Sequence, residues 1–405
     1  MHIGSGFSAN PASAEAVDEA LGRALAALEG ARPELTVLFH SAHHLGAIDE
    51  IAERVGESVA PSGHPGALIG CTAAAVIGDG HEVEEGPALS IWTANLDGAR
   101  VEPFALVAAP GSGGHDEPVT MGLPAIEDDT RAVLVLGDPY TFPPGGLDQL
   151  NAATVEAAIP VIGGMASGGR GPGQHALVYG SKVRTAGGVG VTISGDVQVE
   201  TLVSQGCKPI GSSYTVTGAE GQVISSLGGE PPLDRLRDLF RSLSPEDQAR
   251  MNRGLHVGVV IDEYAPEFGP GDFLIRNVLG ADQGTGAIAV GEDIKVGQTV
   301  QFHIRDASAA DEDLRGRLGV LELSRAGDPA KLAGALLFTC NGRGRHLFGS
   351  PDHDIAAVQA GLGPLPVAGM FCAGEIGPVS GRAFLHGFTA SMALFVAPPA
   401  GSSPS

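Results

Sequence analysis

Two side chains in a glycine-rich segment near the C-terminal end of the sequence could bind or transform a small molecule. Residues 369–378 contain Cys372 and Glu375 among three glycines, and His386 lies further along. Glycines let backbone N–H groups approach a ligand closely, and a carboxylate among them could hold an ammonium group. Cys372 beside a histidine base could instead be a nucleophile. The simpler alternatives are a Glu375 that ties down its own turn and a small buried thiol.

Two weaker copies of this segment occur earlier in the chain, at residues 68–73 and 161–168. An apolar, strand-like run and then a helix-like run precede each copy. The corresponding residues, separated by 32, 28 and 32 positions, are Leu38 and Gly70, Val135 and Gly163, and Leu337 and Gly369. Self-similarity at this spacing indicates one supersecondary unit used several times. We interpret the unit as a strand, a loop, a helix, a glycine-rich turn and further strands.

Each first strand of these units is followed by a loop with polar side chains. They are His40, His43 and His44 in the first loop, Asp138 and Tyr140 in the second, and Asn341 in the third. Imidazoles at a strand end could bind a metal or a haem iron, and His386 is a further candidate haem ligand. No pair of carboxylates or cysteines nearby completes a metal site, so polar loop histidines are the simpler interpretation. Loops at equivalent strand ends could converge on one pocket.

These patterns lead to one predicted ligand site. Its residues are Cys372, Glu375, His386, Asp138, Tyr140, Asn341, Gly374 and Gly377. A positive φ at Gly374 or Gly377 would mark a turn that only glycine tolerates. The same residues predict no resident metal, and haem is the only cofactor for which they offer candidates.

Composition narrows the classes of partner. The 405 residues carry a net charge of −23, which argues against nucleic acid and against an anionic membrane surface. The four cysteines lie far apart without a zinc-binding spacing. Neither a signal-peptide pattern nor an apolar run of about 18 residues is apparent. We therefore expect an acidic, soluble, cytoplasmic protein with reduced thiols and no membrane insertion.

The order of elements predicts an α/β protein, more closely α+β. We expect two related domains of mostly antiparallel sheets covered by helices and built from repeated strand–helix–strand units. Short strands separated by turns over residues 257–305 are typical of an antiparallel meander. The predicted segments are an N-terminal strand and helix at 1–30, a first domain at 31–228, a second domain at 229–397 and a disordered tail at 398–405. Residues 1–228 are not expected to fold well alone, because repeats that share sheets bury their faces against neighbours.

The motifs resemble those of FIST domains. Residues 374–378 with 386–389 resemble the C-terminal part of that family, and residues 300–306 have a counterpart there. Residues 69–72 resemble the Gly-Cys-Ser/Thr turn of the N-terminal part, although alanines at 73–75 replace its more polar continuation. The resemblance covers roughly residues 33–396.

FIST proteins are regarded as sensory modules for small ligands, with amino acids proposed among them, and a subgroup binds haem and senses nitric oxide. The resemblance therefore implies an intracellular, non-catalytic sensory protein in signal transduction. Since the chain has no room for an output domain, a separate signalling partner must supply the output. Two alternatives stay open: a haem-binding nitric oxide sensor of the same family, and an enzyme that uses Cys372 or Glu375 with His386.

Overall fold

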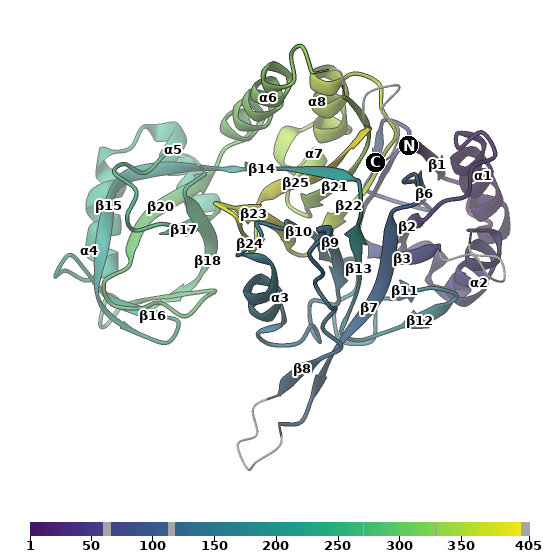
Figure 1. Cartoon of the computed structure of the whole chain (residues 1–405). Coiled ribbons are helices and arrows are strands. Elements are labelled where there is room, and N and C mark those ends of the chain that lie inside the picture. The colour runs from purple at the N-terminus through teal and green to yellow at the C-terminus, as the bar shows by residue number, and fades with distance from the viewer. Residues whose placement is uncertain (60–65, 112–117, 270, 329, 398–405) are drawn as a thin grey trace. The chain divides into compact units, whose positions relative to one another are not determined.

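The computed structural model describes residues 1–59, 66–111, 118–269, 271–328 and 330–397 (Figure 1). The chain forms two compact units. Unit 1 comprises residues 1–203, 315–385 and 389–405, and unit 2 comprises residues 204–314 and 386–388. The α+β class with two domains is confirmed, but each unit is assembled from segments distant in sequence. The tail predicted at 398–405 lies outside the described residues.

Unit 1 consists of three repeats of one strand–helix–strand motif. The first contains β1 (His2–Ser8), α1 (Ser13–Ala26), β2 (Leu35–Ser41), η1 (Ala42–Ala47), α2 (Ile48–Val59), β3 (Ala67–Ala73), β4 (Val76–Gly78), β5 (His81–Val83) and β6 (Leu89–Asn95). The second contains β7 (Arg100–Ala109), β8 (Val119–Met121), β9 (Thr130–Gly137), α3 (Gly146–Thr154), β10 (Val161–Met165), β11 (Leu177–Tyr179), β12 (Lys182–Arg184) and β13 (Gly188–Ser194). The third contains β14 (Gln198–Gln205), β21 (Lys331–Cys340), α7 (Gly344–Phe348), α8 (His353–Leu362), β22 (Val367–Cys372), β23 (Glu375–Val379), β24 (Arg382–His386) and β25 (Thr389–Ala397).

The repeated spacing in the sequence corresponds to strand register. In each repeat two parallel strands pair: β2 with β3, β9 with β10, and β21 with β22. The residues that face each other are Leu38 and Gly70, Val135 and Gly163, and Leu337 and Gly369. The other pairings with a defined register in unit 1, such as β1 with β6, β2 with β6, β9 with β13 and β21 with β25, are antiparallel.

Close backbone approach explains the glycine in each pair. A Cβ at Gly70 would lie 2.3 Å from the Leu38 carbonyl oxygen. At Gly369 the corresponding distance to the Leu337 oxygen is 2.1 Å. Distances this far below van der Waals contact exclude any side chain without a backbone shift.

The short hairpins are exchanged between the repeats in a cycle. Strand β4 of the first repeat pairs with β22 of the third, and β11 of the second pairs with β3 of the first. Strand β23 of the third repeat completes the cycle by pairing with β10 of the second. Each of the three sheets therefore contains strands from two repeats, and none is complete without another part of the chain.

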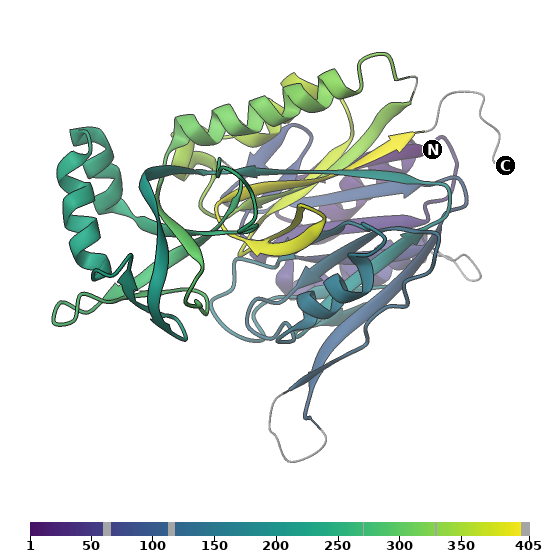
Figure 2. The same ribbon diagram turned by 60° about the vertical axis from the view of Figure 1, so that its left-hand side comes forward.

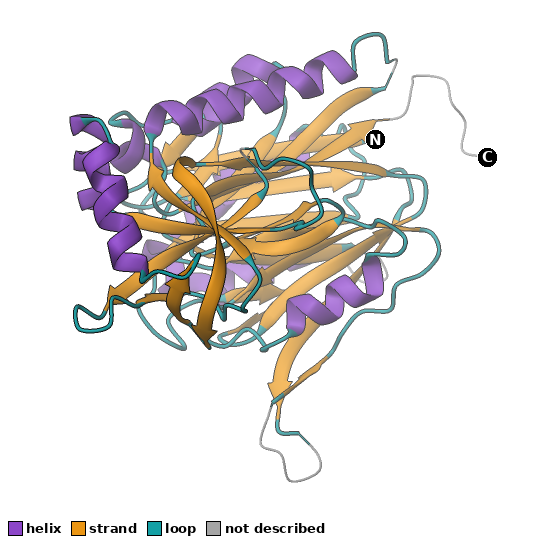
Figure 3. Cartoon of the chain, turned by 90° about the vertical axis from the view of Figure 1, so that its left-hand side faces the viewer, coloured by secondary structure: helices purple, strands orange, loops and turns teal. Residues whose placement is uncertain are grey.

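The three sheets share one apolar core. Its buried side chains come from all three repeats and include Phe39 and Phe338, whose rings pack edge to face with centroids 6.0 Å apart. Helices α1 and α2 pack on the outer face of the first sheet through a second apolar cluster (Figure 1). Figure 3 distinguishes the helices from the strands by colour. The repeats are thus held together by core packing as well as by strand pairing.

Unit 2 is a closed six-stranded barrel inserted into the third repeat (Figure 2). Its strands are β15 (Cys207–Glu220), β16 (Val223–Leu227), β17 (Leu255–Val260), β18 (Phe273–Ala281), β19 (Ile288–Val290) and β20 (Thr299–Arg305). Helices α4 (Pro232–Ser242) and α5 (Pro245–Arg253) follow β16, and α6 (Ala307–Ser324) follows β20. Closure leaves the barrel without a free sheet edge. In the described part of the chain, no helix has the length and apolar character that crossing a membrane requires.

Candidate functional site

The glycine-rich turns of the three repeats meet inside unit 1. Ser167 joins them: its backbone N–H donates to the Thr72 oxygen at 3.1 Å, and its hydroxyl donates to the Phe371 oxygen. The same hydroxyl accepts from the Ala74 N–H at 2.8 Å. We call this region the turn junction; it consists of residues 72–75, 165–168 and 371–374. The turns lie at the carboxyl ends of the parallel strands, where open α/β sheets commonly place their ligands.

Backbone hydrogen bonds also fix the turn junction. Met165 N donates to the Gly374 oxygen at 2.8 Å, and Ala373 N donates back to the Met165 oxygen at 3.1 Å. Phe371 N donates to the Ala75 oxygen at 2.9 Å. Segments almost 300 residues apart in sequence are therefore held together by main-chain contacts.

Glu375 makes the turn junction asymmetric. It faces Gly164 across the strand pair, whereas the equivalent positions of the other two hairpins are Val76 and Leu177. One copy of the repeat therefore carries a carboxyl group where the other copies carry aliphatic side chains. Such a departure from a local pattern is expected at functional sites.

The Glu375 carboxyl group is fully buried, and only one of its two oxygens accepts hydrogen bonds of standard geometry. Its Oε2 accepts from the Thr389 N–H at 3.1 Å and from the Thr389 hydroxyl at 2.9 Å. Its Oε1 has no hydrogen-bond partner within the described residues. Burial raises the pKa of Glu375 to about 8, against the opposing effects of the Thr389 hydrogen bonds, the Arg343 charge and a hydrogen bond with the Cys340 side chain. At neutral pH the group is therefore mostly protonated.

Arg343 is the principal site residue that sequence reasoning missed. It is fully buried and forms a bidentate pair with Asp354, with Nε to Oδ2 at 2.6 Å and Nη2 to Oδ1 at 2.9 Å. Its Nη1 has no hydrogen-bond partner in the described part of the chain. Arg343 lies in the loop between β21 and α7, and its place in that polar loop was the only sequence signal for it.

The Cys372 thiol is buried in the interior of unit 1. Cys372 faces Cys340 across the parallel strand pair and is fully buried. Burial, then the neighbouring Glu375, raises the pKa of Cys372 well above its ordinary value. A nucleophilic cysteine needs the opposite shift, so this environment does not support catalysis through Cys372.

Asp138 and Tyr140 belong to a separate polar cluster in the second repeat. Asp138 is fully buried, accepts from the Tyr140 N–H at 3.0 Å and lies 3.4 Å from His175 Nδ1. The half-exposed Tyr140 ring stacks on His175, with ring centroids 5.9 Å apart. The cluster reaches the first repeat through Ala176, whose N–H donates to the Thr72 hydroxyl at 2.9 Å.

The other predicted site residues are placed as follows. Asn341 is exposed and donates its N–H to the Cys372 oxygen at 3.0 Å, beside the turn junction. His386 is buried and belongs to unit 2. The positive-φ glycines of the described residues include neither Gly374 nor Gly377, so that expectation is wrong. Crowding explains Gly377 instead, because a Cβ there would lie 2.4 Å from Ser391 Oγ.

Of the histidines considered for haem, His40, His43 and His44 each make a hydrogen bond within the protein, but His44 Nε2 is buried without a partner among the described residues. His40 is buried, with Nδ1 3.1 Å from the Ser41 oxygen and Nε2 3.3 Å from the Thr72 hydroxyl. Burial lowers the pKa of His40 to about 4, so the ring is neutral. His43 is exposed and bonded to the Pro11 oxygen, and His44 is bonded to Ser13. His40 cannot coordinate iron without losing a hydrogen bond, and the described residues contain no cluster of three metal-ligating side chains.

Comparison with known proteins gives a consistent result along the chain. The FIST N domain model matches residues 34–230, and the FIST C domain model matches residues 232–378. "Uncharacterized protein Rv0628c" of Mycobacterium tuberculosis is 47% identical over 398 residues, which covers 98% of this chain and all of that protein. "Uncharacterized protein Mb0898c" of Mycobacterium bovis is 44% identical over 397 residues, covering 98% of this chain and 99% of that protein.

The two domain models together match most of the chain, and they meet near residue 231. That point lies inside unit 2, so the FIST N match includes the first strands of the barrel, and the FIST C match continues into the third repeat. The chain belongs to the FIST family.

Proposed function

We propose that this chain is a sensory protein that binds a small polar ligand at the turn junction and passes the signal to a separate partner protein. One observation carries the proposal. Glu375 and Arg343 are both fully buried, influence each other's charge, and each retains one polar atom without a partner among the described residues. Buried polar atoms are nearly always hydrogen-bonded, so a pair of such atoms in one cluster calls for an external group.

The chemistry of the two atoms restricts the ligand. Arg343 Nη1 offers only N–H donors and therefore takes an anionic or acceptor group. Glu375 Oε1 takes a donor once the carboxyl group is ionised. A molecule with an acceptor and a donor close together satisfies both atoms, and a free amino acid carries them as its carboxylate and ammonium groups.

Cys372, Gly374 and Asn341 remain in the proposed site because they adjoin this cluster. Asp138 and Tyr140, which belong to the separate polar cluster of the second repeat, are retained only as sequence predictions, as are His386 and Gly377. Catalysis is not part of the proposal, because the Cys372 thiol is held protonated by its burial.

Because Glu375 is mostly protonated in the free protein, the proposal predicts that ligand affinity depends on pH. An ammonium group binds the ionised carboxylate, whereas the free protein is mostly protonated below pH 8. Binding should therefore release a proton, and affinity should rise by up to about tenfold per pH unit until the pH reaches about 8. Calorimetry in two buffers of different ionisation enthalpy measures the released proton directly.

Native mass spectrometry of the purified protein would first identify any retained ligand, and calorimetry with the twenty common amino acids would follow. Glu375→Gln should weaken binding of the identified amino acid by roughly 1.5–3 kcal/mol, the range for a hydrogen bond to a charged group. Glu34→Gln is the control, because Glu34 is a partly buried carboxyl group that also accepts a backbone N–H, from Leu96, and is not part of the turn junction. Unchanged affinity in a folded Glu375→Gln variant would show that this carboxyl group is structural.

The haem alternative has a separate test. Titration of the protein with haem should produce a Soret band if any histidine coordinates the iron, and replacement of that histidine should abolish the band. This measurement is independent of the calorimetry and separates the two ligand classes.

A further inference from the structure

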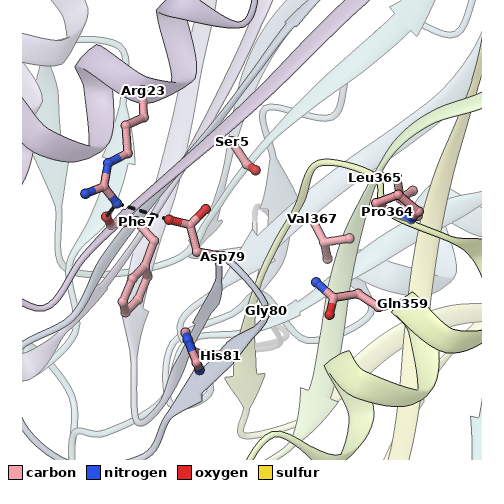
Figure 4. Close-up of a pocket in the computed structure, with 10 residues that line it drawn as sticks. All are labelled: Ser5, Phe7, Arg23, Asp79, Gly80, His81, Gln359, Pro364, Leu365 and Val367. Atoms are coloured by element: carbon pink, nitrogen blue, oxygen red, sulfur yellow. Dashed lines mark hydrogen bonds and ion pairs between the residues drawn. The ribbon is translucent and has the colours of Figure 1, made fainter.

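A cavity in unit 1 is lined by none of the turn-junction residues. It has a volume of about 770 Å³, within the usual range of ligand pockets. Figure 4 shows its lining, which comes from the first repeat (β1, α1 and the β4–β5 turn) and the third (α8 and the start of β22). We call this cavity the hairpin pocket.

The β4–β5 turn places the carboxyl group of Asp79 in the hairpin pocket. Asp79 and Gly80 are the two turn residues, with φ of 50° and 79°, as a type I′ hairpin turn requires. The equivalent turn of the third repeat carries Ser380 and Gly381, with φ of 51° and 78°. The first repeat therefore presents a carboxylate where the third has only a hydroxyl.

The third repeat anchors this hairpin firmly. Glu82 N donates to Asp352 Oδ1 at 2.6 Å, and the Ile355 N–H donates to Glu82 Oε1 at 2.9 Å. His81 Nδ1 lies 3.3 Å from Asp352 Oδ2. Because both walls are fixed by these contacts, the pocket is formed before any ligand arrives.

The charges in the hairpin pocket cancel. Arg23 Nη1 donates to Asp79 Oδ2 at 3.1 Å and to the Phe7 oxygen at 3.0 Å. The guanidinium and the carboxylate therefore neutralise each other at the rim (Figure 4). An ionic ligand would gain from one of these groups and be repelled by the other, so the pocket does not select for charge.

Several polar side-chain atoms that line the hairpin pocket are not used in hydrogen bonds within the protein. Asp79 Oδ1, the Gln359 amide and the Ser5 hydroxyl have no hydrogen-bond partner among the described residues, and all three residues line the pocket. Together they offer both donors and acceptors. Phe7 and Val367 add apolar surface at the base of the same pocket.

We propose that the hairpin pocket binds a neutral, polyhydroxylated small molecule of the size of a monosaccharide or cyclitol. Hydroxyl groups both donate and accept, which matches the uncommitted polar atoms of Asp79, Gln359 and Ser5. The C–H faces of such a ring fit the apolar base. The inference does not depend on the ligand of the turn junction, and either can fail without the other.

Saturation-transfer NMR on the full chain tests the proposal with D-glucose, D-ribose and myo-inositol as probes. Sodium benzoate and benzylamine serve as the anionic and cationic comparisons. At least one polyol should receive saturation, and Asp79→Asn and Gln359→Ala should each weaken its binding by at least about tenfold. Asparagine tolerates the left-handed backbone of this turn, so Asp79→Asn should still fold.

Asp97→Asn is the matched control, because Asp97 also precedes a glycine in a left-handed turn and does not line the pocket. Its polyol binding should equal that of the unmodified chain. Binding of benzoate or benzylamine in preference to all polyols would overturn the proposal. So would the absence of polyol binding at millimolar concentration, or polyol binding that survives both pocket substitutions.

Discussion

Arg343 and Asp354 form a bidentate ion pair in which neither side chain is exposed to solvent. The Thr339 hydroxyl adds a third hydrogen bond to Asp354, at 2.6 Å. Although burial alone would raise the pKa of Asp354, the Arg343 charge and these hydrogen bonds hold it well below its ordinary value. The pair also fixes the guanidinium whose Nη1 has no hydrogen-bond partner among the described residues.

Asp354→Asn should lower the free energy of unfolding by about 3–5 kcal/mol, because it leaves Arg343 as an uncompensated buried charge. Urea denaturation measures this directly. The control is Asp148→Asn, which breaks the exposed pair of Asp148 with Arg382 and should have little effect. Similar small losses in both variants would show that the buried pair adds no stability.

Replacement of a register glycine by alanine should destabilise unit 1. The Cβ of Gly369→Ala would collide with a backbone oxygen, so the strands must shift, at a cost of about 1–3 kcal/mol or more. Gly22→Ala is the matched control, because Gly22 lies in α1, is exposed and has no atom within 4 Å of an added Cβ. That variant should instead gain roughly 0.5–1 kcal/mol. Equal effects at the two positions would refute the packing explanation.

The stability of the protein should fall as the pH rises through the range in which buried Glu82 titrates. Burial, then the neighbouring Asp354 carboxylate, raises the pKa of Glu82 to about 8 from an ordinary value of 4.5. Its stabilising contribution is therefore fully present below about pH 4.5 and is lost by about pH 8, at up to about 1.4 kcal/mol per pH unit.

Glu82→Gln removes this titration but keeps an acceptor for the Ile355 N–H. Relative to the unmodified chain, the variant should become progressively more stable between about pH 5 and pH 8. Denaturation curves at several pH values give the comparison. A stability difference that does not change with pH would mean that Glu82 is already ionised in the folded protein.

The repeats were predictable from sequence because register is a local property. The number of residues between an apolar strand and the following glycine recurs within the chain, and it determines which residues face each other in the paired strands. Leu38 and Gly70 are one such pair. The exchange of hairpins was not predictable. The sequence pattern of β4 is compatible with pairing in its own sheet and with pairing to β22, and the structure shows the second. The choice depends on packing across all three sheets.

The site was partly predictable for the same reason. Glu375 was identified because it stands out from the repeated turn, whereas Asp354 lies at the start of a helix where an acidic residue is ordinary. Its partnership with Arg343 is a tertiary contact that no spacing in the sequence reveals. Neither Gly374 nor Gly377 has the positive φ that would require a glycine. Gly377 is explained by crowding instead, because a side chain at this position would collide with Ser391.

The hairpin exchange predicts how fragments of the chain behave. Residues 1–228 contain the first two repeats but lack β22, which pairs with β4, and β23, which pairs with β10. In the fragment, β4 and β10 would therefore have unpaired edges, and the apolar core would be open to solvent. The fragment should aggregate or remain molten.

Residues 204–314 carry every strand of the closed barrel together with its own apolar core. This fragment should be monomeric in analytical ultracentrifugation and should melt cooperatively in circular dichroism. It serves as the control for residues 1–228, because it too is a fragment cut from the full chain. If residues 1–228 were instead a monomer with a cooperative transition, the exchanged hairpins would be dispensable, and unit 1 would not fold as one cooperative body.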